Sequence, residues 1–135
     1  MKFEEKYFSR FHFTSEQIQK NLSNACKDLE IAKKVKILDV KFNYSYTALI
    51  KTGIALLSFH QARIKSVPGH QAKIIEKLAE ILNDDSVDAV GNVMRSKRNL
   101  DFYAGGIEIT EKECEEYLKF VEGILMKVKK IVSKK

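Results

Sequence analysis

The chain has 135 residues, of which 44% are hydrophobic and 31% are charged, and its net charge is +6. This length and composition exclude a disordered chain and predict one domain, residues 1–135, that folds without metal or disulfide support. The longest apolar stretch, Ile54 to Phe59, is far shorter than the ~20 residues that a membrane span needs. We therefore expect a cytoplasmic protein with no membrane segment and no export signal.

The positive charge is compatible with an acidic partner such as RNA. Five lysines and no acid lie between Lys127 and Lys135. This pattern is typical of a solvated helix end, with a nucleic-acid contact as the alternative. Cys26 and Cys114 are the only cysteines and neither has a metal-binding spacing, so we expect reduced thiols, no metal site and no cofactor.

The chain contains one proline, six glycines and no run of alternating apolar and polar residues. This pattern predicts an all-α fold, an up-and-down bundle of four to five helices. Residues 1–13 precede the first helix as an aromatic-rich arm. We expect the arm to pack on the bundle or on a second subunit, with a base-stacking surface for RNA as the alternative. Its aromatic residues are Phe3, Tyr7, Phe8, Phe11 and Phe13.

The first helix is predicted to begin at Thr14, which forms a capping box with Gln17, while Phe13 packs against Ile18 across the first turn. Apolar residues one turn apart predict its inward face. These residues are Ile18, Leu22, Cys26 and Leu29.

The second helix is predicted over Asp39 to Ser66 and is apolar around most of its circumference, which is typical of a central helix. Gly53 costs about 1 kcal/mol relative to alanine within a helix, so we expect another backbone to approach it closely. The run Val67-Pro68-Gly69 is expected to end this helix.

The third helix is predicted over His70 to Leu82, and the fourth from a cap at Ser86 to Phe102, before Gly105-Gly106. The fifth helix opens at Thr110 with a second capping box. Its inward residues are predicted to be Tyr117, Leu118, Val121, Leu125, Val128 and Val132.

One polar cluster, near the end of the fourth helix, departs from the pattern of a solvated face. Helical spacing puts Arg95, Asn99 and Tyr103 on one face and makes Arg98 and Asp101 neighbours. An ordinary structural role would pair Arg98 with Asp101 and pack Tyr103 at the helix end. A binding role would use the arginines and the phenol on phosphate oxygens.

The end of this helix resembles the signature of HEPN domains (higher eukaryotes and prokaryotes nucleotide-binding), in which an arginine, a polar residue and three variable residues precede a histidine. The corresponding run is Arg98-Asn99-Leu100-Asp101-Phe102-Tyr103. Three further motifs are similar to HEPN proteins in the same order. They are Gln61-Ala62-Arg63-Ile64-Lys65, the turn Pro68-Gly69-His70-Gln71, and Gly105-Gly106-Ile107-Glu108-Ile109-Thr110-Glu111. The resemblance covers Phe42 to Val132.

The resemblance implies a HEPN-like bundle that forms a homodimer, with two copies of the signature meeting in a cleft. RNase members of the family cleave RNA there without metal. Other members bind RNA, nucleotides or a partner protein, or pair with a minimal nucleotidyltransferase in toxin–antitoxin systems. By position, the expected ligand-binding residues are Arg95, Arg98, Asn99, Asp101, Tyr103 and His70.

Tyr103 stands where RNase members carry the histidine. A histidine ordinarily titrates near ~6.5 and exchanges protons at neutral pH, whereas a tyrosine titrates near ~10. Arginine stays protonated and cannot act as a base. Among the other histidines, His60 is expected to be a hydrogen-bonded interior residue and His70 a cap or turn residue able to line a cleft. Binding is therefore favoured over efficient catalysis.

Three hypotheses follow for the function. The first is a non-catalytic HEPN-like module that binds RNA, a nucleotide or a partner protein, as part of a toxin–antitoxin pair with a nucleotidyltransferase. The second is a metal-independent HEPN endoribonuclease toxin, with Arg98 and Tyr103 as catalytic candidates and His70 as a substitute base. The third is a structural helical adaptor.

Overall fold

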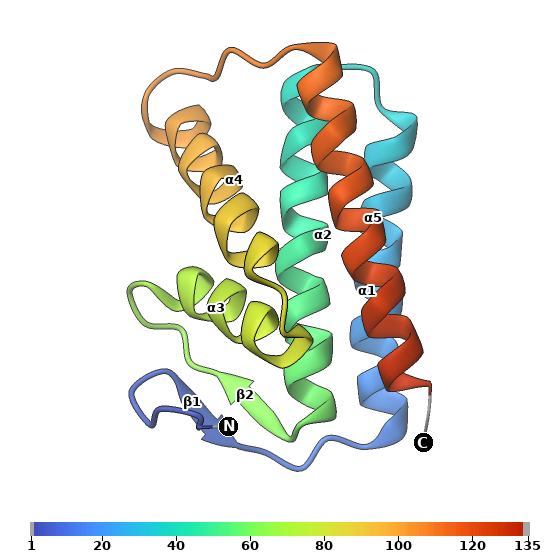
Figure 1. Ribbon diagram of the computed structural model, residues 1–135, viewed down its shortest axis with the longest axis vertical. Coiled ribbons are helices and arrows are strands. Elements are labelled where there is room, and N and C mark those ends of the chain that lie inside the picture. Colours follow the sequence, from blue (N-terminus) through green and yellow to red (C-terminus); the bar gives the residue numbers. More distant parts are fainter. Residues whose placement is uncertain (1, 134–135) are drawn as a thin grey trace.

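The structure is a computed structural model that describes residues 2–133, and these residues form five helices and one two-stranded antiparallel sheet (Figure 1). We call this strand pair the hairpin, although two helices lie between its strands in the chain. The predicted all-α class is thus confirmed, with the hairpin as an addition. The elements are β1 (Phe8–Arg10), α1 (Ser15–Lys34), α2 (Leu38–Phe59), β2 (Ala62–Ile64), α3 (His70–Leu82), α4 (Asp85–Tyr103) and α5 (Glu111–Val132). α1, α2, α4 and α5 run alternately up and down the long axis, and α3 lies across it.

The central element is α2, as its sequence predicts. It packs against α1 and α5 on one side and against α3 and α4 on the other. Phe42, Leu49 and Leu56 on this helix have no exposed surface. No helix within residues 2–133 is long and apolar enough to cross a membrane.

Side-chain caps set most helix starts. The hydroxyl of Thr14 accepts from the backbone N–H of Gln17, and Thr110 and Glu113 form the same reciprocal contact. Both predicted capping boxes are confirmed, and the predicted bounds of the third helix match those of α3. In α1 the buried face passes through Ala25, and Cys26 is only half-buried.

The predicted cap of the fourth helix at Ser86 is wrong. Asp84 is the N-cap, and its Oδ1 accepts from the backbone N–H and the hydroxyl of Ser86 at 3.0 and 2.6 Å. Ser86 therefore donates to the cap and lies in the first turn of α4. A carboxylate fits this position well because it also interacts favourably with the positive end of the helix dipole.

The predicted second helix is too long, because α2 ends at Phe59 and the following residues form β2. Gln61 has a φ of 59°, a left-handed conformation that turns the chain out of the helix. β2 then pairs antiparallel with β1, placing Ala62 opposite Arg10. The Gln61 side chain joins the turn to the arm, because its Oε1 accepts from the N–H of Phe13 at 2.7 Å.

The N-terminal arm (residues 2–13) lies against α3 and β2 and is held by lysines. Lys73 pairs with Glu4 at 3.1 Å and lies 5.0 Å from the ring centre of Tyr7. Lys77, which is only 4% exposed, donates to the carbonyl oxygen of Lys2. The expected packing of the arm on the bundle is thus observed.

Two glycines allow α3 to lie close to its neighbours. A Cβ at Gly53 would lie 2.4 Å from Cγ2 of Ile74, and one at Gly91 would lie 2.7 Å from Cγ2 of Ile75. The close approach expected at Gly53 is therefore made mainly by a side chain, while the Ile74 carbonyl oxygen would be 3.8 Å away. These contacts fix α3 between α2 and α4 and so bring its first turn beside α4.

Candidate functional site

A cleft of about 550 Å³ lies between α4 and the turn that leads into α3. Its lining contains two arginines and no acidic residue. We call it the basic cleft, and five of the six predicted ligand-binding residues line it. The lining residues are Ser66, Val67, Pro68, Gly69, His70, Gln71, Ala72, Arg95, Arg98, Asn99 and Tyr103.

α4 supplies the charged wall of the cleft. Arg95, Asn99 and Tyr103 face it together because their spacing places them on one side of the helix. The Nε of Arg95 donates to Oδ1 of Asn92 at 3.2 Å, which orients that guanidinium. Arg98 lies over the ring of Phe102, with its Cζ 4.8 Å from the ring centre.

The opposite wall is the first turn of α3. Gly69, with a φ of 82°, is the N-cap, and within the described chain no side chain caps this helix. The start of α3 therefore presents backbone N–H groups and the positive end of a helix dipole next to the two arginines. Pro68-Gly69, which was predicted to end the second helix, instead leads into α3 and shapes one wall of the cleft.

Tyr46, on α2, holds the Gln71 side chain of this wall in place. It is 1% exposed, and its hydroxyl donates to Oε1 of Gln71 at 2.7 Å. Because Oε1 of Gln71 accepts this hydrogen bond, the side-chain NH₂ group is what Gln71 can offer to a ligand. Burial raises the pKa of Tyr46 to about 12, against the smaller opposing effect of the positive charges on Arg95 and Arg98.

His70 also has a defined orientation. Its Nδ1 lies 2.9 Å from the carbonyl oxygen of Val67. Because a carbonyl oxygen can only accept, we assign the proton to Nδ1. In the neutral ring Nε2 is then the nitrogen with a free lone pair, which is the group that a general base requires.

Asp101, the sixth predicted ligand-binding residue, does not line the cleft. Its Oδ2 accepts from Nδ2 of Asn43 at 2.7 Å, so it ties α4 to α2. This contact also replaces the structural pairing with Arg98 that the sequence suggested. His60, half-buried at the end of α2, lies outside the cleft as well. Its ring packs edge to face on Phe59, and burial lowers its pKa.

Several large apolar side chains of α4 are exposed, most of them near its C-terminal end. Tyr103 is 79% exposed and packs its ring on Phe102, which is 65% exposed. Val93 and Leu100, seven positions apart on α4, are half-exposed. The HEPN-like run thus lies at the end of a helix that exposes several apolar side chains.

Sequence reasoning missed two residues of this site, Gln71 as a donor and Tyr46 as its support. A signal was present, because a tyrosine within an apolar helix needs a hydrogen-bond partner for its hydroxyl. No position in the pattern indicated which residue that partner would be. Within residues 2–133 no group of three or more potential metal ligands is present.

No family model, curated protein or solved structure matches this chain. The likeness to HEPN domains therefore depends on the chain's own motifs, and the function has to be argued from the geometry of the cleft.

Proposed function

We propose that the chain is a HEPN-like module that binds a phosphate-bearing ligand, RNA or a nucleotide, in the basic cleft. One observation carries the proposal: two arginines and a helix N-terminus line the same cleft, and no carboxylate does. Arg98 is also the arginine of the HEPN-like signature.

Each wall has a distinct task in this proposal. Arg98 keeps its in-plane N–H groups available while its face rests on Phe102, so it can hold two phosphate oxygens at once. The start of α3 binds the phosphate through backbone N–H groups. Asn99 and Gln71 add amide donors at the edge of the cleft. This arrangement grips anions without requiring proton transfer.

Fluorescence anisotropy with a labelled single-stranded RNA tests the proposal. Arg98→Ala is expected to weaken binding about tenfold or more and to reduce the dependence on salt by about one phosphate contact. Arg63→Ala is the matched control, because Arg63 lies on β2 away from the cleft. Equal losses for the two variants would mean that binding depends on overall charge, and the cleft would then be rejected.

A second candidate function, metal-independent RNA cleavage, is favoured by the orientation of His70. Its Nε2 lone pair and the Tyr103 hydroxyl belong to one cleft and could share the acid–base work. Purified protein incubated with RNA and a chelator tests this function. Cleavage that is lost in both His70→Ala and Tyr103→Phe would establish this function. RNA that stays intact at high protein concentration would rule the function out.

We further infer that the protein is a homodimer that uses the face of α4 carrying Val93 and Leu100, which lie two turns apart on one side of the helix. Four of the seven exposed large apolar residues within residues 2–133 lie on this helix, namely Val93, Leu100, Phe102 and Tyr103. Covering Val93 and Leu100 would bring two basic clefts near each other, while Tyr103 stays in the cleft. Light scattering is expected to give twice the chain mass, and Leu100→Lys is expected to return the monomer mass.

The exposed Tyr103 also suits modification by a nucleotidyltransferase partner. In this step the phenol oxygen attacks the α-phosphate of a nucleoside triphosphate, loses its proton and releases pyrophosphate. In that pairing the added nucleotide would occupy the cleft and silence it. Mass spectrometry of the chain co-expressed with such an enzyme would show an added nucleotide that Tyr103→Phe lacks. If mass spectrometry detected the chain only in its unmodified form, this partnership would be contradicted.

A further inference from the structure

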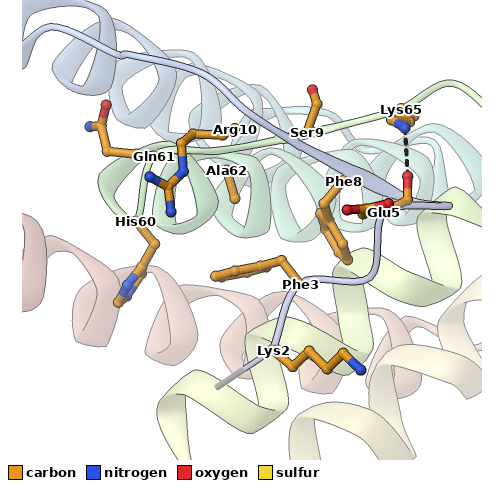
Figure 2. A pocket seen from close by; sticks show the side chains of 10 residues that line it. All are labelled: Lys2, Phe3, Glu5, Phe8, Ser9, Arg10, His60, Gln61, Ala62 and Lys65. Atoms are coloured by element: carbon orange, nitrogen blue, oxygen red, sulfur yellow. Dashed lines mark hydrogen bonds between the residues drawn. The ribbon is translucent and has the colours of Figure 1, made fainter.

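The hairpin encloses a second cavity, which we call the hairpin pocket. Its volume is about 780 Å³, within the range of ~300–1,000 Å³ typical of small-molecule sites. One wall is the N-terminal arm and the other is the end of α2 with β2 (Figure 2). The lining residues are Lys2, Phe3, Glu5, Phe8, Ser9, Arg10, His60, Gln61, Ala62 and Lys65.

The base of the hairpin pocket is apolar and well supported. Phe8 and Ala62 are 3% and 5% exposed. Phe3 packs edge to face on Phe8, with ring centres 5.4 Å apart, and Lys77 lies 5.4 Å from the centre of the Phe3 ring. The Phe3 ring is therefore held in place as a surface on which a flat ligand can pack.

The rim is positively charged. Lys2, Arg10 and Lys65 line it against a single carboxylate, Glu5. Lys65 donates to the carbonyl oxygen of Glu5 and keeps further N–H donors. The Arg10 guanidinium has no hydrogen-bond or ion-pair partner within residues 2–133. An arginine that lines the same pocket as an aromatic ring and has no partner is well placed to bind an anion.

His60 closes the side of the pocket opposite Lys65. Burial lowers its pKa, so the ring is neutral at pH 7 and offers one donor and one acceptor. Figure 2 shows the rings of Phe3 and His60 and the Arg10 guanidinium directed towards the same space. The pocket thus combines a flat apolar surface, a neutral polar ring and a cation.

We propose that the hairpin pocket binds a small organic anion with a flat ring, which packs on Phe3 and His60 while its phosphate or carboxylate pairs with Arg10. This site shares no lining residue with the basic cleft and does not depend on the proposed function. The same chemistry could come from a nucleoside monophosphate or from an aromatic carboxylic acid, and the experiment separates these two sources.

Isothermal titration calorimetry of the full chain with adenosine monophosphate and, separately, with indole-3-acetate tests the site. At least one of the two is expected to bind in the millimolar range or tighter, and inorganic phosphate and adenosine alone are expected to bind at least about tenfold more weakly. Arg10→Gln is expected to weaken the binding at least about tenfold. Arg63→Gln, the same change of charge on the neighbouring strand, is expected to leave it unchanged.

Two further variants make the outcome decisive. Phe3→Leu keeps an apolar residue at the base of the pocket. It is expected to weaken the binding of the anion that carries a ring and to leave the weak binding of phosphate unchanged. Arg98→Gln is expected to leave the binding that depends on Arg10 unchanged, because Arg98 does not line the hairpin pocket. The proposal is overturned if neither compound binds, or if Arg98→Gln abolishes binding while Arg10→Gln does not, which would assign the ligand to the basic cleft. Equal melting temperatures for Arg10→Gln and the parent chain exclude misfolding.

Discussion

The long-helix layer formed by α1, α2 and α5 and the smaller half formed by α3, α4 and the hairpin differ in how much of their surface is covered. Thirteen residues of α2 are buried, compared with three of α4, although the two helices are of similar length. The first half holds most of the core, and the second exposes arginines, aromatic rings and a helix start. A stable layer on one side thus lets the other side present groups that contribute little to folding.

The largest expected effect tests this division directly. Leu49→Ala in the middle of α2 removes a fully buried side chain and is expected to cost about 2–5 kcal/mol of unfolding free energy. Val93→Ala on α4 removes a half-exposed one and is expected to change the free energy by less than about 0.5 kcal/mol. Urea unfolding at low protein concentration measures both. Similar costs would contradict the division.

The next effect probes the link between the halves through Tyr46. Its folded-state pKa of about 12 lies above the ordinary value near ~10, so folding favours the protonated phenol. This contribution is complete below about pH 10 and is lost as the pH rises towards 12, by roughly 2 kcal/mol. Tyr46→Phe is expected to show a smaller loss over that interval in urea unfolding. If the unfolding free energy of the two chains fell equally with pH, the Tyr46 hydroxyl would have to be solvent-exposed.

A smaller effect concerns the contact between α2 and α3. Gly53→Ala would force Ile74 aside, and we expect a net cost of up to about 2 kcal/mol, because the better helix propensity of alanine offsets part of the overpacking. Gly123→Ala on α5 is the matched control, because no atom lies within 4 Å of the added Cβ. That change is expected to stabilise the chain by up to about 1 kcal/mol. Thermal unfolding measures both changes. A higher melting temperature for Gly53→Ala would mean that α3 can move away from α2 at little cost.

The smallest effect concerns the start of α4. Asp84→Ala removes the N-cap and is expected to lower the melting temperature by roughly 2–6 °C. Ser86→Ala removes only a donor to that cap and is expected to have a smaller effect. Hydrogen bonds from Ser86 hold the pKa of Asp84 below its ordinary value, so acid weakens this cap as the carboxylate is protonated. The reverse order of the two variants would restore Ser86 as the cap.

The elements that depend on neighbouring residues were predictable from the sequence. Thr14 and Thr110 cap their helices through residues three positions along, and α3 begins directly after Gly69. The same local rule places Arg95, Asn99 and Tyr103 on one wall, because the spacing of a helix fixes which side chains share a face.

The hairpin was not predictable in the same way. β1 and β2 are three residues each and lie about fifty residues apart in the chain, so neither shows an alternating pattern long enough to indicate a strand. Ala62 and Ile64 continue the apolar character of α2, and only the left-handed conformation of Gln61 separates them from it. The hairpin pocket depends on this long-range pairing, and so it too was missed.

The short α3 lines the basic cleft and holds the arm that forms one wall of the hairpin pocket. Its first turn borders the basic cleft, and further along Lys73 and Lys77 hold the arm that walls the hairpin pocket. A ligand that tilted this helix at one end would also shift the wall at the other. Thermodynamic linkage then requires reciprocity: if occupancy of one pocket changes affinity at the second, occupancy of the second changes affinity at the first by the same factor.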